Sequence, residues 1–251
     1  FREKYLAFHH LSLNVTKNLN IGVFESVTFA RNDSTQTSGI DLNYLNPVIF
    51  FRPIEQNRAS FDNAILGLDW KWNLWGKMQF YGQFIVDELV FKEFTSSNGD
   101  WRNKQGAQVG IKYIDVAGIK NLDLQLEMNY VRPFTYTHFS RDTLNSPKNN
   151  QYSNYQHFGQ ALAHPLGANF QEFIAILRYQ PIPRLQLTGQ ILYAEMGEDG
   201  SGQNFGGNIF KDYGTRNQDT GINIGDGINA TLMRASFAAS YQLRHNLFLE
   251  A

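Results

Sequence analysis

A long segment between residues 132 and 170 combines the side-chain types that recognise sugars. It carries tyrosine, asparagine and histidine at short intervals and shows no regular hydrophobic period. Aromatic rings offer flat apolar faces to sugar C–H groups, and side-chain amides both donate and accept hydrogen bonds, as hydroxyl groups require. The candidate ligand-binding residues of this segment are Tyr136, Asn149, Asn150, Tyr152, Asn154, Tyr155 and His157.

A second polar segment, residues 200–229, is rich in glycine, asparagine and aspartate. Asp212, Tyr213 and Arg216 are expected to contact an acidic or neutral glycan, since the guanidinium fork of arginine binds carboxylates at two points. The aspartates of this segment do not follow the spacing of a twelve-residue calcium loop, so we expect no metal. The chain has no cysteine, which excludes disulfides and thiolate ligands, and no cofactor is expected.

Catalytic arrangements are not supported by the spacing. His138 and Ser140 lie close in sequence, but no third group that would orient the histidine is evident. Asp87 and Glu88 are adjacent in a predicted strand and point to opposite faces, so they do not flank one bond. The formal net charge of -1 gives no basic field for nucleic acid. We therefore expect a non-enzymatic protein without a nucleic-acid partner.

The elements that position these segments show a period of two residues. In "LDLQLEMNY" (122–130), apolar and polar residues alternate strictly, which is the pattern of a strand with two different faces. The same alternation recurs at 66–74, 78–87, 107–113, 172–180, 185–194 and 233–244, and less cleanly in a first hairpin over 5–30. We expect nine strands and a tenth that begins near Leu247. Their lengths, about 10–15 residues, suit tilted membrane strands better than soluble ones.

The predicted connections alternate in length. Tight turns are expected at 17–20, 75–77, 118–121, 181–184 and 245–246, and long links at 31–62, 92–104, 132–170 and 196–229. Up-and-down membrane barrels have short turns on one side and long extracellular loops on the other. Aromatic residues near the tight turns match an interfacial belt: Trp70, Trp72, Trp75, Tyr113, Tyr179 and Tyr241. The sequence thus predicts an all-β, antiparallel, up-and-down outer-membrane β-barrel with transmembrane strands; a large soluble β-sandwich is the alternative.

Charged residues of both signs fall on the face predicted to line the barrel. These lumenal charges are Asp69, Lys71, Asp87, Lys112, Asp123, Glu127, Arg178, Arg234 and Arg244. Their mixed sign predicts a charge network that holds the wall, and the alternative is an ion-selective pore. The segment 132–170 has a similar alternative, because it is able to fold into the lumen as a plug packed by its own aromatic rings. A plug and a sugar-binding surface are compatible.

Two apolar or turn-forming segments have structural interpretations. "NPVIFFRPIE" (46–55) is too apolar for a free loop, so we expect a short helix or a lumenal plug there. "AHPLGANF" (163–170) is expected to be a fixed turn. The whole of 1–251 is interpreted as one barrel segment of nine to ten strands. It is expected to be incomplete at both ends, because the first strand starts on the long-loop side and an open sheet edge cannot face lipid.

Whole segments resemble the capsule assembly Wzi family, and most closely its larger, gliding-motility-associated RemB branch. They are "LNPVIFFRPIE" (45–55), "DNAILGLDWKW" (62–72), "YGQFIVDEL" (81–89), "NLDLQLEMNYVRPFTYTH" (121–138) and "AHPLGANFQEFIAILRYQP" (163–181). The resemblance spans most of the chain. It implies an outer-membrane barrel of about eighteen strands that binds capsular or surface polysaccharide without catalysis. It carries over no ligand motif residue by residue.

The expected function is therefore a lectin-like outer-membrane barrel of a Gram-negative bacterium. It would bind, anchor or help to assemble surface polysaccharide through extracellular loops. Its expected partners are outer-membrane lipid and lipopolysaccharide, the polysaccharide itself and other outer-membrane complex subunits. A porin-like channel, or a barrel subunit of a secretion or gliding complex, is the main alternative, and an outer-membrane hydrolase is a third.

Overall fold

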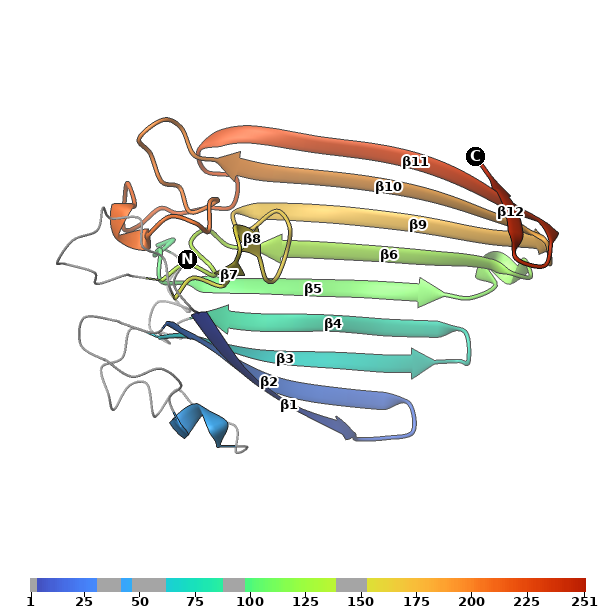
Figure 1. Ribbon diagram of the computed structural model, residues 1–251, viewed down its shortest axis with the longest axis horizontal. Coiled ribbons are helices and arrows are strands. Elements are labelled where there is room, and N and C mark those ends of the chain that lie inside the picture. Colours follow the sequence, from blue (N-terminus) through green and yellow to red (C-terminus); the bar gives the residue numbers. More distant parts are fainter. Residues whose placement is uncertain (1–3, 31–41, 47–61, 88–97, 139–152) are drawn as a thin grey trace.

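The computed structural model describes residues 4–30, 42–46, 62–87, 98–138 and 153–251. Ten strands form one antiparallel sheet in which each strand lies next to its successor along the sheet, in the order β1-β2-β3-β4-β5-β6-β9-β10-β11-β12 (Figure 1). The remaining two short strands, β7 and β8, form a separate hairpin. The all-β, antiparallel prediction is confirmed. In the described ranges, no helix has the length and apolar character needed to cross a membrane.

The strands of the large sheet are mostly ten or more residues long. They are β1 (Lys4–Asn14), β2 (Leu19–Ala30), β3 (Asn63–Leu74), β4 (Met78–Asp87), β5 (Lys104–Tyr113), β6 (Leu122–Val131), β9 (Phe170–Ile182), β10 (Leu185–Glu198), β11 (Ile228–Arg244) and β12 (Leu247–Glu250). The hairpin is β7 (Gln156–His157) and β8 (Gln160–Ala161), and three short 3-10 helices are η1 (Leu42–Leu45), η2 (Val116–Gly118) and η3 (Tyr213–Thr215).

The connections gather by length at the two ends of the sheet. Figure 1 shows the tight turns β1–β2, β3–β4, β9–β10 and β11–β12 at one end and the long connections at the other. The tight turn predicted at 118–121 is longer in the structure. β5 ends at Tyr113, and the link to β6 spans 114–121. Asp115 at the start of η2 and Ala117 inside it both adopt positive φ values, of 53° and 56°, so the chain leaves the extended conformation over this link.

The register gives the sheet one predominantly polar face. Asp69 of β3 is opposite Gln83 of β4, which is opposite Gln108 of β5. Gln108 is in turn opposite Asn129 of β6, and Asn129 is opposite Glu172 of β9. Cross-strand partners point to the same side of a sheet. We call the side that carries these residues the polar face.

The opposite side, which we call the apolar face, exposes large hydrophobic side chains. They include Leu11, Val23, Leu68, Trp72, Val109, Leu126, Met128, Phe173, Leu177, Ile191, Met233 and Phe237. Met233 is 73% exposed and Phe237 is 70% exposed. Soluble monomers rarely expose continuous apolar patches larger than a few hundred Å². The described residues leave most of this face uncovered, which is typical of a surface that packs against an apolar partner.

Two aromatic rings of the polar face lie directly over glycines on neighbouring strands. A Cβ atom at Gly67 would lie 2.1 Å from the ring of Phe24, and one at Gly110 would lie 2.2 Å from the ring of Tyr81. Each glycine is the cross-strand partner of the ring that covers it. The missing side chains thus leave room for both rings over the neighbouring strand. Phe24 lines the cavity described below, and the Tyr81 hydroxyl bonds to Glu127 beneath it.

Two small cores lie on opposite faces, both near the long-connection end. On the polar face, Ile65, Ile85, Val131 and Phe170 pack with Ile209 from the connection between β10 and β11. On the apolar face, the cluster joins Val27, Phe29, Ala64 and Tyr44, and Tyr44 comes from η1. The ring centroids of Phe29 and Tyr44 are 4.7 Å apart. The helix or plug predicted at 46–55 lies, apart from its first residue, outside the described residues.

Candidate ligand-binding cavity

A cavity of about 480 Å³ lies between the polar face and the segment that precedes β9. The sheet contributes residues from β1 to β6, and residues 155–164 contribute from above. Its lining residues are Phe8, His10, Phe24, Ser26, Ile65, Asp69, Gln83, Ile85, Gly106, Ala107, Gln108, Asn129, Tyr130, Val131, Tyr136, Tyr155, Leu162, Ala163 and His164. The segment predicted either to bind sugars or to plug the lumen therefore covers part of the polar face and encloses a space there.

Aromatic rings line the cavity from both sides. Tyr136 and Tyr155 stack with their ring centroids 5.9 Å apart and an interplanar angle of 26°. Phe8 and Phe24 lie 5.8 Å apart on the sheet side. Tyr136 has a positive φ of 73°, and its backbone N–H donates to Asp87 Oδ2 at 2.6 Å. Burial raises the pKa of the Tyr136 phenol above its ordinary value, so this ring is neutral at physiological pH.

The floor of the cavity is a ladder of side-chain amides that donate hydrogen bonds to the carboxylates of Glu127 and Glu172. Glu127 accepts a hydrogen bond from Gln108 at 3.1 Å and another from Asn129 at 3.0 Å. Its second oxygen accepts from the Tyr81 hydroxyl at 2.6 Å. Asn129 also donates to Glu172 at 2.9 Å. The amides are thereby fixed in position, which gives the floor defined hydrogen-bonding groups at little entropic cost to a ligand.

Two histidine–carboxylate pairs flank the ladder. His10 Nε2 lies 2.8 Å from Asp69 Oδ2, and His164 Nε2 lies 3.1 Å from Glu172 Oε2. The ring of His164 also stacks on Phe170, with 4.4 Å between centroids. The sequence prediction gave 163–170 a structural role, and the segment does form a turn in which Gly167 N–H donates to the His164 carbonyl at 2.9 Å. The same histidine side chain also lines the cavity.

One hydroxyl at the cavity wall has no protein partner in the described part of the chain. Ser26 is only 1% exposed, and its Oγ is buried without a hydrogen bond. A buried hydroxyl that makes no hydrogen bond costs roughly 1–3 kcal/mol. Native structures usually satisfy such a group, so the Ser26 hydroxyl is a candidate contact for a polar group that enters the cavity.

The predicted lumenal charges fall on the polar face. The register places Asp69, Lys71, Asp87, Lys112, Asp123, Glu127, Arg178 and Arg234 on that side, and Arg244 follows beyond a bulge in the β11–β12 pairing. Their side-chain contacts are largely with groups outside this set of charges. Lys112 Nζ lies 5.1 Å from the Tyr81 ring centroid, and Arg178 Nη1 lies 3.4 Å from Gln125 Oε1.

The predicted ligand residues of 132–170 separate in the structure. Tyr136 and Tyr155 line the cavity, whereas Asn149, Asn150 and Tyr152 lie outside the described residues. Asn154 is fully buried, and its amide accepts from His138 N–H at 2.5 Å and donates to the Ile209 carbonyl at 2.7 Å. His157 is exposed on the β7–β8 hairpin, with its ring 4.1 Å from that of Phe158.

The predicted residues of 200–229 are held by a cluster around Trp101. Tyr213 packs on Trp101 with 4.6 Å between ring centroids, and the Arg216 guanidinium lies 4.2 Å from the Trp101 centroid. Arg216 Nε also pairs with Asp219 at 2.6 Å. Asp212 accepts from Gly214 N–H at 2.6 Å and so caps η3. None of the three lines the cavity, and their contact with a glycan remains a prediction.

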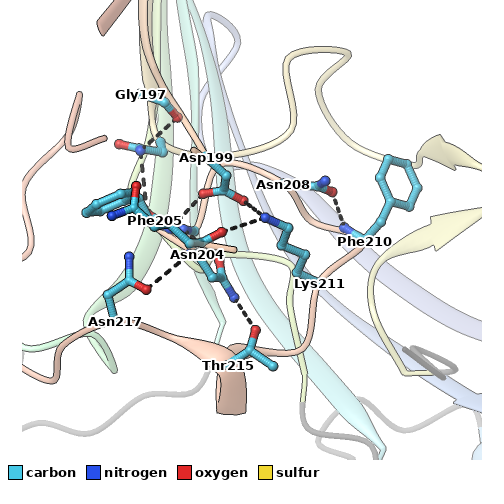
Figure 2. A network of polar contacts seen from close by, with 12 residues as sticks. Gly197, Asp199, Asn204, Phe205, Asn208, Phe210, Lys211, Thr215 and Asn217 are labelled. Carbon is cyan, nitrogen blue, oxygen red and sulfur yellow. Dashed lines mark hydrogen bonds and ion pairs between the residues drawn. The ribbon is translucent and has the colours of Figure 1, made fainter. Parts of the chain in front are cut away.

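Asparagines that the sequence did not single out organise the connection between β10 and β11. Asn169 donates to the carbonyls of Gly197 at 3.0 Å and Asp226 at 2.8 Å, and it accepts from Gly225 N–H at 2.7 Å. Figure 2 shows the neighbouring network, in which Asn204 donates to Thr215 at 2.9 Å and Asp199 pairs with Lys211 at 2.8 Å. Asparagine is common in polar loops, so composition alone does not mark these positions.

Within the described ranges, no group of three or more acidic or histidine side chains is arranged to hold a metal ion.

Comparisons with known proteins add no assignment to this geometry. Searches against protein-family models, curated proteins and solved structures found no match for the chain. The resemblance to the Wzi family is therefore a prediction that rests on the sequence segments quoted above.

Proposed function

We propose that the chain forms part of the wall of an outer-membrane β-barrel that binds surface polysaccharide without catalysis. The barrel would be of the Wzi type, with long connections outside the cell and the polar face turned to the lumen. Outer-membrane lipid and lipopolysaccharide would contact the apolar face. The observation that carries the binding function is the cavity between the polar face and residues 155–164, with its aromatic walls and amide floor.

The membrane part of the proposal is supported by the two faces of the sheet. Long strands that expose leucine, phenylalanine and methionine on one side and amides and charges on the other match the pattern of a transmembrane barrel. Strands β1 and β12 are the edges of the described sheet. Lipid cannot satisfy their free backbone groups, so in a membrane both edges must be paired. A barrel of about eighteen strands would pair them with further strands.

The binding part is supported by the combination of groups in the cavity. Stacked tyrosines offer apolar faces, and Gln83, Gln108 and Asn129 offer amides that donate and accept. The buried Ser26 hydroxyl adds a group that needs a polar partner. A cavity of about 480 Å³ falls within the ordinary range for small-ligand sites. A hydroxyl-rich ligand with apolar C–H faces, such as a short stretch of glycan, matches both kinds of lining.

Binding without catalysis is supported by what the cavity histidines contact. His10 and Asp69 resemble the base and the orienting acid of a hydrolase triad, at 2.8 Å. A triad also needs a serine hydroxyl bonded to the histidine. Ser26 is the serine of the cavity lining, and its hydroxyl makes no hydrogen bond to His10 or to any other described residue.

Replacing Tyr155 with alanine should weaken polysaccharide binding by roughly tenfold, because the stacked ring and its apolar contact area are lost. The measurement is equilibrium dialysis of the full-length protein in detergent against surface polysaccharide from its own bacterium, with neutral dextran as the reference polymer. Phe158→Ala is the matched control, since Phe158 is an aromatic residue three positions away that is 76% exposed and does not line the cavity.

Equal binding by the wild type and the Tyr155→Ala variant would contradict the assignment of the site. A large steady current through the full-length protein in a planar bilayer, together with no polysaccharide binding, would favour the porin-like alternative. Stoichiometric co-purification with another outer-membrane protein, again without polysaccharide binding, would favour a subunit of a secretion or gliding complex.

A further inference from the structure

A second cavity, of about 510 Å³, lies at the tight-turn end of the sheet. Its lining residues are Asn73, Gly76, Lys77, Met78, Gln79, Lys112, Tyr113, Ile114, Asp123, Leu124, Gln125 and Arg178. Three of these are basic and one is acidic. Lys112 lies four residues after Gln108 on β5, so its side chain is on the polar face, about 13 Å along the strand from the floor of the first cavity. We call this second space the basic cavity.

The positive charge of the basic cavity is carried by Lys112 and Arg178. Lys77 is already paired with Asp115 at 3.2 Å. The backbone N–H of Asn121, with help from Lys77, holds the pKa of Asp115 below its ordinary value, so this partner is ionised at physiological pH. Lys77 is therefore largely neutralised, whereas the described groups in direct contact with Lys112 and Arg178, the Tyr81 ring and the Gln125 amide, are neutral.

The described contacts of Lys112 and Arg178 include no carboxylate. The Lys112 ammonium is 5.1 Å from the ring centroid of Tyr81, and Arg178 Nη1 is 3.4 Å from the amide oxygen of Gln125. In the described part of the chain, no carboxylate lies within ion-pair distance of either cation. Asp123 is opposite Arg178 in the register, but its carboxylate accepts from Asp115 N–H at 3.2 Å instead.

The neutral lining suits an anion as well. Gln79 and Gln125 are the cross-strand partners of Lys112 on either side, so their amides stand beside the ammonium group. Side-chain amides donate hydrogen bonds to anion oxygens, and a guanidinium group binds carboxylate or phosphate through two parallel N–H groups. Two cations with amide donors between them form a site for one anionic group.

We infer that the basic cavity is a subsite for an anionic group of the bound glycan, a carboxylate of a uronic acid or a phosphate. This inference rests on the proposed polysaccharide function. It adds that the bound polymer is acidic. The Tyr81 hydroxyl joins the two cavities, because it donates to Glu127 under the first and accepts from Gln125 in the second. A glycan that leaves the first cavity along the polar face therefore meets Lys112 and Arg178 next.

The double variant Lys112→Gln and Arg178→Gln tests the subsite in the full-length protein. The probe is trigalacturonic acid, a short chain of uronic acids, measured by isothermal titration calorimetry in detergent. We expect the affinity to fall by at least about tenfold, as the loss of two charge-assisted contacts implies. The wild-type affinity should also fall when NaCl is raised from about 50 mM to about 500 mM, because salt screens exposed charges.

Two further double variants and a second probe complete the test. Lys71→Gln with Arg244→Gln removes the same charge from polar-face strands outside the cavity lining and should leave binding unchanged. Lys112→Arg with Arg178→Lys keeps both charges and should retain most of the affinity. Inorganic phosphate as competitor separates the two anions: strong displacement identifies a phosphate site and weak displacement a carboxylate site. Both results support an anionic subsite.

The inference is overturned if the wild type fails to bind both trigalacturonic acid and phosphate, or if the Lys112→Gln, Arg178→Gln variant binds as the wild type does. Tyr155→Ala separates this result from the proposed function, because Tyr155 does not line the basic cavity. Anion binding that survives in Tyr155→Ala, in a protein that does not bind its own polysaccharide, would retain the subsite and reject the polysaccharide function.

Discussion

Replacing Phe237 with arginine is expected to destabilise the protein in a lipid bilayer by about 2–4 kcal/mol, the cost of an arginine on the lipid-facing side of a membrane barrel near its midplane. Phe237 is 70% exposed on the apolar face and lies near the middle of β11. Its cross-strand partner on β10 is Gly189, so the position directly opposite has no side chain that would cover the new charge. The measurement is urea unfolding of the full-length protein in phospholipid vesicles.

The adjacent residue provides the control for this substitution. Ser236 is the next residue on β11 and points to the polar face, where Gln190 is its cross-strand partner. Ser236→Arg introduces the same side chain on the polar face and should cost less than about 1 kcal/mol, because we expect the charge to be solvated there. Similar losses for the two variants would mean that the apolar face does not lie against lipid.

Replacing Asn169 with alanine is expected to destabilise the connection between β10 and β11 by about 2–4 kcal/mol. Asn169 is fully buried, and its amide makes three hydrogen bonds of 3.0 Å or less to backbone groups of Gly197, Gly225 and Asp226. Alanine would leave the buried carbonyl of Gly197 and the half-buried backbone groups of Gly225 and Asp226 without this side-chain partner. The backbone of residue Asn169 also has a positive φ of 58°, a conformation that asparagine tolerates better than alanine.

Hydrogen exchange over residues 199–227 is the measurement for Asn169→Ala, since the loss is local to that connection. Backbone amides there should exchange faster by more than about tenfold. Asn208→Ala is the control, because Asn208 is exposed and its side chain accepts only one hydrogen bond, from Phe210 N–H at 2.9 Å. If exchange in Asn169→Ala equals that in the control, the amide of Asn169 does not hold this connection together.

The strands were predictable because their pattern is local. Alternation in residues 122–130 depends only on neighbouring side chains, and β6 spans Leu122–Val131 as the alternation indicates. The β5–β6 turn was less predictable, because nothing in the pattern announces the positive φ values of Asp115 and Ala117. The order of strands followed from the alternation of short and long connections, which leaves each strand beside its sequence neighbour.

The candidate cavity was predictable only in part. The sequence pointed to Tyr136 and Tyr155 by their type, but the floor residues Gln83, Gln108 and Asn129 come together through the register between strands. A shift of one residue in that register would move each of them to the other face, and alternation within a single strand does not fix it. The buried state of Asn154 likewise depends on contacts with Ile209 and His138, which lie 55 and 16 residues away in the sequence.

The central claim is that the apolar face lies in lipid while the polar face is turned away from it. The chain has no cysteine, so single cysteines are available as unique sites for spin labels along β11, from Met233 to Ser240. Accessibility of each label to oxygen, which enters lipid, and to a water-soluble nickel chelate is measured in vesicles by electron paramagnetic resonance. The account predicts alternation with a period of two, with oxygen favoured at Met233 and Phe237 and the chelate favoured at Arg234 and Ser236. Uniform access of the chelate to all positions would contradict it.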